Sequence, residues 1–240
     1  MEFKKIKNFI LDLFFPKECF GCGEEGLYLC HQCLGKIDLN KRYYCALCKA
    51  ESRQSLICPN CRTGSSLLAV WVATDYNNKI LQDLIHHLKY NYLEELAEDL
   101  ANLAISYLET NNILNTFELN QANTIIVPVP LHKKRFLSRG FNQSELLTKK
   151  IGNYFRFSNK GLITRNINTP SQINLKRIDR QANVRDVFSL ITIKDCDKNK
   201  KIILIDDVIT TGSTLNECAK ILSEHGFKEI YGLVIAQRED

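Results

Sequence analysis

The chain has 240 residues, of which 45% are hydrophobic and 25% charged, and its formal net charge is +5. These proportions are those of a soluble globular protein with room for one α/β domain and a small satellite. No run of about 18 apolar residues occurs and no signal-peptide pattern opens the chain, so we expect a cytoplasmic protein without a transmembrane segment. The mild positive charge permits an anionic ligand without identifying one.

The first 16 residues have the pattern of a short amphipathic helix that Pro16 ends. Its apolar face consists of Phe3, Ile6, Phe9, Ile10, Leu13 and Phe14. Such a segment fits two interpretations, a helix that touches a membrane surface or a helix that packs on its own domain. The shortness of the segment favours the second interpretation.

Eight of the 10 cysteines form four C-x-x-C pairs in one short stretch of the chain. The pairs are Cys19 with Cys22, Cys30 with Cys33, Cys45 with Cys48, and Cys58 with Cys61. One pair brings two thiolates to a metal and two pairs complete a tetrahedron, so four pairs predict two Zn²⁺ ions. Few large apolar residues accompany them, so we expect zinc to supply folding free energy rather than catalysis.

Two questions about the cysteines stay open at this point. Neighbouring pairs would form a double zinc ribbon, whereas alternating pairs would form a cross-braced site. Redox-active dithiols are a further interpretation, which the gathering of all four pairs in one short segment weakens. We assign residues 1–66 to the N-terminal helix and the zinc-binding module, and residues 67–240 to a second domain.

The second domain opens with an apolar, β-branched and aromatic run, residues 67–76, that predicts a strand. Helical spacing follows over residues 81–88 and again over 93–108, and the Asn-rich residues 110–123 predict a loop. His86 and His87 are adjacent, so on a helix they point about 100° apart and are poor joint metal ligands. Lys89 follows them, and either a phosphate contact or a solvated helix end suits it.

A second strand is predicted from Thr124 up to the prolines at 128 and 130, and five basic side chains follow within eight residues. They are His132, Lys133, Lys134, Arg135 and Arg139. Because ligands of α/β sheets bind just beyond strand ends, this basic loop predicts a pyrophosphate or polyanion site, and a solvated basic turn is the alternative. A helix is expected to start near Gly140–Gln143.

The segment from Arg165 to Arg185 is polar, has no clear periodicity and carries four arginines. Long polar loops inside compact domains are usually functional or disordered. A lid that closes over a charged substrate and a loop that follows a nucleic-acid backbone would both have this composition.

The most informative stretch is residues 201–214. With Lys200 before it, the stretch reads KKIILIDDVITTGST. Four apolar residues predict a strand buried on both faces, and Asp206 and Asp207 follow. A small polar turn then leads into a helix with apolar residues at i, i+3, i+4 and i+7, and Gly226 can cap the end of that helix. The residues of the turn are Thr210, Thr211, Gly212, Ser213 and Thr214.

This arrangement suits a phosphate monoester, because a helix N-terminus offers free N–H groups and the positive end of its dipole. Gly212 lets an anion approach the backbone, and the hydroxyl groups of the turn add donors. The two carboxylates are placed to hold sugar hydroxyls or a Mg²⁺ ion. The alternative is a buried strand with an Asp pair, as in a Walker B segment or a receiver domain. No G-x-x-x-x-G-K-[ST] segment occurs, so the phosphate-binding loop that accompanies a Walker B segment is missing from the sequence.

The stretch resembles the phosphoribosyl pyrophosphate (PRPP) motif of type I phosphoribosyltransferases. Together with the cysteine pairs, Val127-Pro128-Val129-Pro130, Arg139-Gly140-Phe141-Asn142-Gln143 and Arg180-Gln181-Ala182-Asn183-Val184, the chain resembles the ComF (ComFC) competence proteins and the related GntX-like proteins over nearly its full length. The resemblance implies an α/β fold, namely a Rossmann-like, mainly parallel phosphoribosyltransferase domain behind a double zinc ribbon.

The resemblance also implies site roles and partners. The turn Thr210–Thr214 would bind the 5′-phosphate of Mg²⁺–PRPP, and Asp206 and Asp207 would hold the ribose as catalytic carboxylates. Arg135, Arg139 and Lys89 would face the pyrophosphate. The expected role is natural transformation, with single-stranded DNA and the DNA-uptake machinery at the inner face of the membrane as partners. Three functions stay open, namely a DNA-uptake factor, an active phosphoribosyltransferase on an unidentified base or amine, and a PRPP-sensing regulator.

Overall fold

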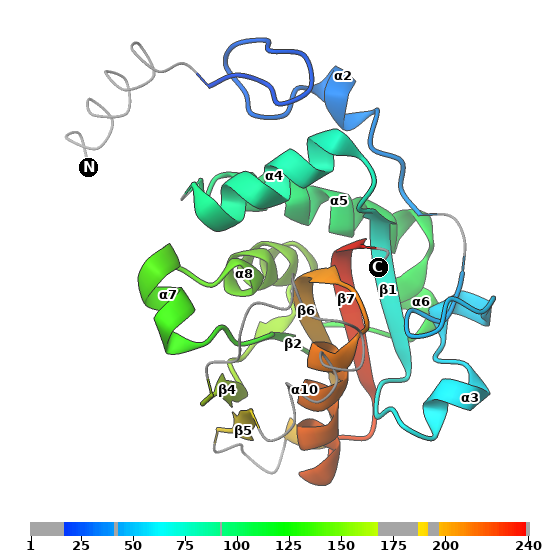
Figure 1. Cartoon of the computed structure of the whole chain (residues 1–240). Coiled ribbons are helices and arrows are strands. Elements are labelled where there is room, and N and C mark those ends of the chain that lie inside the picture. Colours follow the sequence, from blue (N-terminus) through cyan, green and yellow to red (C-terminus); the bar gives the residue numbers. More distant parts are fainter. Residues whose placement is uncertain (1–16, 41–42, 92, 168–186, 192–196, 239–240) are drawn as a thin grey trace.

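The structure is a computed structural model that describes residues 17–40, 43–91, 93–167, 187–191 and 197–238. A five-stranded sheet in the order β1-β7-β6-β2-β3 lies at its centre, and all of its strand pairs are parallel (Figure 1). A separate antiparallel pair, β4 with β5, lies beside it. The strands are β1 (Ala69–Asp75), β2 (Thr124–Pro128), β3 (Ser158–Asn159), β4 (Ile163–Arg165), β5 (Phe188–Leu190), β6 (Lys201–Ile209) and β7 (Ile230–Gln237).

Longer helices connect the strands, and short ones occur in the cysteine-rich region. The helices are α2 (His31–Leu34), the 3-10 helix η1 (Arg53–Ser55), α3 (Pro59–Arg62), α4 (Lys79–Tyr90), α5 (Leu96–Thr110), α6 (Ile113–Thr116), α7 (Lys133–Arg139), α8 (Gln143–Phe155) and α10 (Ser213–Glu224). Asparagine side chains start two of them, since Asn78 accepts from the N–H of Leu81 and Asn142 from that of Ser144. None of the described helices is long and apolar enough to cross a membrane.

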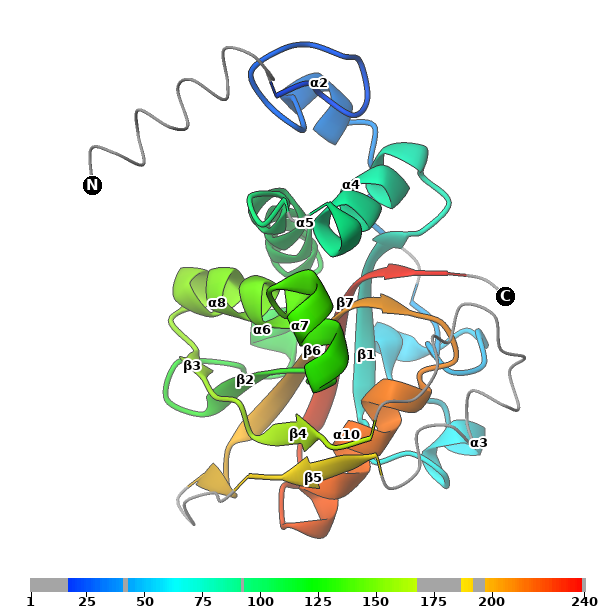
Figure 2. The ribbon, with the colours of Figure 1, turned by 60° about the vertical axis from the view of Figure 1, so that its left-hand side comes forward.

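The two faces of the sheet bury separate cores. Along β1, Trp71 and Ala73 belong to the core under α4, α5 and α8, while Val70 and Val72 belong to the core under α10. This alternation follows from the two-residue period of a strand. Figure 2 shows α4, α5 and α8 on one side of the sheet and α10 with β4 and β5 on the other.

The cysteine-rich region divides between these two faces. Its first part contributes Cys19, Cys30 and Cys33 to the core with α4 and α5, and its second part contributes Cys45 and Ile57 to the core with α10. Figure 1 shows the first part above α4 and the second beside β1. We call residues 17–39 the first ribbon and residues 43–66 the second ribbon. The division of the chain at residue 66 into two domains stays a prediction.

The predicted strand at 67–76 and the helices around 81–88 and 93–108 are confirmed as β1, α4 and α5. Three expectations were wrong in detail. The loop predicted at 110–123 contains α6, and the basic loop after β2 is the helix α7, which ends at Gly140 with a φ of 80°. The strand around 202–205 continues to Ile209, because Val208 and Ile209 still pair with β7. β3, β4, β5 and β7 were not predicted.

The helix predicted in the first 16 residues lies outside the described residues, as does most of the polar segment that runs from Arg165 to Arg185. The predicted end of the C-terminal helix is confirmed, because Gly226 follows α10 with a φ of 101° and its N–H donates to the carbonyl of Ser223 at 3.0 Å.

Candidate functional site

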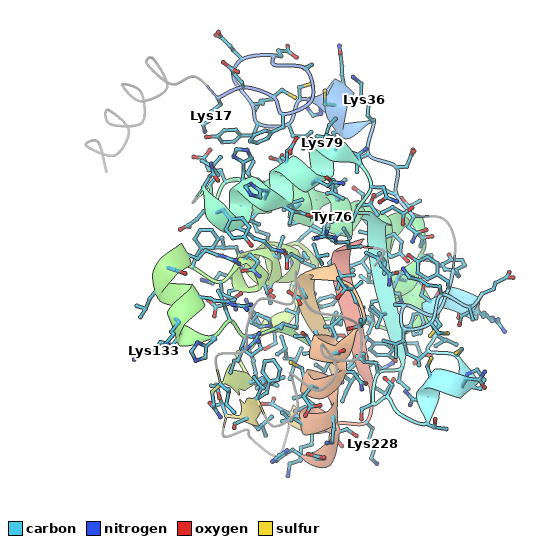
Figure 3. The ribbon with its side chains drawn as sticks, viewed as in Figure 1. Lys17, Lys36, Tyr76, Lys79, Lys133 and Lys228 are labelled. Atoms are coloured by element: carbon cyan, nitrogen blue, oxygen red, sulfur yellow. The ribbon has the colours of Figure 1, made fainter. Side chains whose placement is uncertain are left out.

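A cavity of about 330 Å³ lies at the carboxyl ends of the parallel strands. It is lined by the ends of β6 and β2, the C-terminal part of α4, the start of α8 and the turn before α10. Ligands of open parallel sheets bind at this edge because loops and helix N-termini converge there. Tyr76, at the end of β1, also lines the cavity, and Figure 3 shows it between α4 and the strands.

The acidic pair lies inside this cavity as part of β6. Asp207 is 3% exposed and forms an ion pair with the ammonium of Lys89 on α4. The amide Nε2 of Gln143 lies 3.5 Å from its other oxygen, Oδ1. Asp206 accepts from the Ser144 hydroxyl at 3.0 Å and from the N–H of Asp207 at 2.9 Å. Helices α4 and α8 therefore hold the two carboxylates in place.

The two carboxylates differ in their ionisation. Burial, together with the negative charge of Asp207, raises the pKa of Asp206 to about 7. Burial also opposes ionisation of Asp207, but the ammonium of Lys89 outweighs it and lowers the pKa of Asp207 below its ordinary value. Near neutral pH one carboxylate is therefore ionised, and the other is close to its titration point.

The turn between β6 and α10 has the geometry of an anion site. Gly212 precedes the helix with a φ of 76°, a conformation that other residues rarely adopt. The hydroxyls of Thr211 and Ser213 lie 2.7 Å apart, and both residues line the cavity. The helix N-terminus adds backbone N–H groups and its dipole to this loop, which consists of residues 210–214 and which we call the anion loop.

Cationic side chains complete the cavity wall. Arg139 donates to the side-chain carbonyl of Gln143, and its guanidinium lies 5.5 Å from the ring centroid of Tyr90. Burial lowers the pKa of Arg139, yet the base strength of a guanidinium keeps it charged. Arg135 and Arg165 line the same cavity. The cavity thus combines carboxylates, a helix N-terminus and guanidinium groups, which suits a ligand with hydroxyls and several phosphates.

All ten candidates for ligand binding and catalysis line this one cavity. They are Lys89, Arg135, Arg139, Asp206, Asp207, Thr210, Thr211, Gly212, Ser213 and Thr214. Their individual roles stay predictions, and Lys89 contacts Asp207 in addition to facing the cavity.

Sequence reasoning missed Ser144, His86 and Arg238, which also line the cavity. Gln143 belongs to the Arg-Gly-Phe-Asn-Gln motif, and its side chain contacts both Arg139 and Asp207. The available signal was the position of Gln143 and Ser144 directly after the Arg-Gly-Phe-Asn segment, where a helix was expected to start near a strand end. His86 and Arg238 carried no such signal.

The eight cysteines form two four-thiolate clusters, and the pairing is between neighbouring pairs. In each cluster the four sulfur atoms lie within 4.8 Å of one another, as Cys19, Cys22, Cys30 and Cys33 and as Cys45, Cys48, Cys58 and Cys61. The sulfurs of Cys22 and Cys30 are 3.7 Å apart and those of Cys48 and Cys58 are 3.5 Å apart. Tetrahedral zinc with Zn–S bonds of about 2.3 Å separates its sulfurs by about 3.8 Å, so both clusters fit structural zinc.

Backbone donors support the thiolate form of Cys19 in the first cluster. Burial raises the pKa of the Cys19 thiol, but N–H groups of Cys30, Gly21 and Cys22 outweigh it and bring the pKa to about 6. The N–H of Cys30 lies 3.4 Å from the Cys19 sulfur. A thiolate held by amide donors is the form that binds metal.

Comparison with protein families matches both parts of the chain. A family model described as a double zinc ribbon domain matches residues 10–62, and one described as a phosphoribosyl transferase domain matches residues 176–240. The first model agrees with the observed pairing of the cysteines. The second covers β6, the anion loop, α10 and β7.

Several characterised proteins are similar over most of the chain. Competence protein F of Haemophilus influenzae is 30% identical over 222 residues, which are 85% of this chain and 94% of that protein. The DNA utilization protein YhgH of Escherichia coli K12 is 31% identical over 216 residues, 82% of this chain and 92% of that protein. Competence protein ComFC of Bacillus subtilis is 27% identical over 208 residues, 82% of this chain and 79% of that protein.

Proposed function

The chain belongs to the family of competence protein F and ComFC, and on that premise we propose that its cavity binds Mg²⁺–PRPP or a related phosphorylated ribose while the protein serves DNA uptake in natural transformation. The proposed compartment is the cytoplasm, where zinc-bound thiols stay reduced. The single observation that carries the ligand is the meeting of the anion loop and the acidic pair in one cavity.

The ligand fits the cavity group by group. Its 5′-phosphate would accept hydrogen bonds from the N–H and hydroxyl groups of the anion loop, and its ribose hydroxyls would donate to Asp206 and Asp207. Arg135 and Arg139, on α7, would contact the pyrophosphate. Carboxylate oxygens and phosphates are the usual ligands of Mg²⁺, which when bound neutralises charge on a departing pyrophosphate.

Titration calorimetry with Mg²⁺–PRPP tests this proposal. The double variant Asp206→Asn with Asp207→Asn should lose binding, because both ribose acceptors lose their charge, while its zinc content stays at two ions per chain. Lys228→Ala is a matched control, since Lys228 is exposed and Figure 3 shows it at the opposite end of the sheet. If the unaltered protein gives no heat with millimolar PRPP, the proposed ligand is wrong.

Turnover separates a transferase from a sensor. A phosphoribosyltransferase would release pyrophosphate when a base or amine acceptor is added, with charge on the leaving group stabilised by Arg135 and Arg139. A PRPP-sensing regulator would bind the same ligand and release no pyrophosphate, whichever acceptor is added. An assay of pyrophosphate with a panel of nucleobases and amines distinguishes the two.

Single-stranded DNA is the second proposed ligand, and the exposed side of α7 favours it. Phe136 is 41% exposed, Tyr90 on the neighbouring α4 is 50% exposed, and Lys133 lies at the outer edge of the molecule (Figure 3). Basic side chains beside exposed aromatic rings suit phosphate contacts and base stacking. The arrangement extends the basic wall of the cavity toward solvent.

Binding of a labelled oligonucleotide tests this second ligand through its salt dependence. Affinity should fall steeply between about 50 and 200 mM salt, and Lys133→Ala with Lys134→Ala should reduce the slope by about two, because each lysine would neutralise one phosphate. Lys228→Ala should leave the slope unchanged. A slope near zero would argue against phosphate contacts, and normal transformation in a deletion strain would overturn the proposed cellular role.

A further inference from the structure

The anion loop is covered on one side by the second ribbon. A Cβ atom placed on Gly212 would lie 2.3 Å from Cδ2 of Leu47, so the Leu47 side chain fills the space where any larger residue at 212 would extend. Leu47 is one of the two residues between Cys45 and Cys48. A residue of a zinc knuckle therefore packs directly on the backbone of the anion loop.

Two further contacts join the second ribbon to the elements that flank the loop. The side-chain amide of Gln237, at the end of β7, donates to the carbonyl of Ala46 at 2.9 Å, and Gln237 is 2% exposed. The side-chain amide of Asn216, in the first turn of α10, donates to the carbonyl of Gly64 at 3.0 Å. The loop, the strand beside it and the helix after it thus all contact the same ribbon.

The position of Leu47 depends on the metal site that surrounds it. The knuckle closes through hydrogen bonds from Cys45 N–H to the Ala50 carbonyl and from Lys49 N–H to the Cys45 carbonyl, each at 2.8 Å. Lys49 adopts a φ of 67°, a conformation that is unfavourable for a lysine. A tight turn with so little apolar core of its own needs the bound metal for its stability.

The first ribbon provides a built-in comparison. Its contacts include α4 and β1. The Phe20 ring lies 4.4 Å from that of His87 on α4, Asn78 at the start of α4 donates to the carbonyl of Lys36 at 2.9 Å, and the hydroxyl of Thr74 on β1 donates to the carbonyl of Asp38 at 2.7 Å. Among the backbone hydrogen bonds and core contacts of the described residues 17–39, none reaches the anion loop. The two metal sites are alike in their ligands and differ in what they touch.

We propose that the second ribbon is a functional part of the anion site, in which Leu47 is a positioning residue that holds the loop in its anion-binding conformation. Zinc at Cys45, Cys48, Cys58 and Cys61 and an anion at the loop then stabilise each other, because coupling between two sites is reciprocal. The identity of the anion, Mg²⁺–PRPP, rests on the proposed function, whereas the coupling between the metal site and the loop does not.

Leu47→Ala tests the positioning role, with Leu29→Ala as its matched control. Leu29 is a buried leucine beside Cys30 in the first ribbon and packs in the other core. Leu47→Ala should speed hydrogen exchange in residues 209–216 and weaken Mg²⁺–PRPP binding by about tenfold, a factor typical of coupling between two sites. Leu47→Met should restore both, and Leu29→Ala should change neither.

Zinc removal from one ribbon at a time tests the coupling itself. Cys48→Ser with Cys58→Ser should leave one zinc ion per chain and raise hydrogen exchange across the anion loop, and Cys22→Ser with Cys30→Ser should leave one zinc ion and an unchanged loop. Equal effects of the two double variants, or no effect of Leu47→Ala on loop exchange, would overturn the inference. A loop that responds as expected in a protein that does not bind PRPP would overturn the proposed ligand alone.

Discussion

The two zinc ribbons have the same ligand set, four cysteines in two C-x-x-C pairs, yet they pack on opposite faces of the sheet and contact the site differently. The second ribbon touches the anion loop through Leu47. The first touches α4, and α4 in turn carries Lys89, which pairs with Asp207. One ribbon is therefore in direct contact with the site, and the other is one helix away from it. Similar modules acquire different roles because the chain between them packs them on different partners.

The largest expected effect comes from breaking the ion pair between Lys89 and Asp207, which lies at the end of the helix that the first ribbon contacts. Lys89→Met should cost about 3 kcal/mol of unfolding free energy, because it leaves Asp207 as an unpaired charge that is only 3% exposed. Adding Asp207→Asn should recover most of this loss, since the buried charge is then removed. Denaturant unfolding of the two single variants and the double variant measures the coupling. Additive losses in the double variant would show that the pair contributes nothing.

A second prediction concerns Asp206, which neither ribbon contacts directly. Its native pKa of about 7 exceeds the ordinary value of 3.8, so the native state holds this proton more tightly than the unfolded chain. The stability contributed by this group is complete below about pH 4 and is lost as the pH rises through about 7. Asp207, whose pKa is lowered, acts in the opposite direction, with stability present above 3.8 and lost in acid.

Asp206→Asn should remove this loss of stability. The unfolding free energy of the variant relative to the unaltered protein should therefore be higher at pH 8 than at pH 5, by about 2 kcal/mol. Thermal unfolding at several pH values measures this. The same pH profile should persist in Leu47→Ala and Phe20→Ala, because neither side chain contacts the acidic pair. A profile that changed with either ribbon variant would mean that both ribbons act on the carboxylates.

The smallest expected effect comes from the contact between the first ribbon and α4. Phe20→Ala should cost about 1 kcal/mol of unfolding free energy, the usual value of one aromatic pair. Its effect should couple to that of Lys89→Met, because both act on α4, and should add to that of Leu47→Ala within about 0.5 kcal/mol. Double-mutant cycles of unfolding free energy check both statements. A non-additive effect of Phe20→Ala and Leu47→Ala on the unfolding free energy would contradict the statement that the two ribbons act through separate contacts.

Local patterns in the sequence predicted much of the scaffold. The apolar run before Asp206 predicted a buried strand, helical spacing predicted α4, α5 and α10, and the C-x-x-C pairs predicted two zinc sites. These signals work because each depends on residues close together in the chain. The short strands β3, β4 and β5 were missed, since two or three residues carry no measurable periodicity.

The candidate site was predicted in part for the same reason. The acidic pair and the anion loop are contiguous, so their chemistry could be recognised, and the basic residues after β2 were expected near a strand end. The helix α7 is not predictable from the sequence, because its seven residues contain too few apolar positions to show a helical period.

The sequence by itself determined the fold class, through motifs spread along the chain, and it determined the two four-cysteine metal sites and the anion loop with its acidic pair, because each of these is encoded in a short continuous segment. Only the tertiary structure decided which cysteine pairs share a metal, that Lys89 neutralises Asp207, and that Leu47 lies against Gly212. Each of these contacts joins residues that are distant in the chain. Their proximity depends on how sheet, helices and ribbons pack together, and no local pattern specifies that packing.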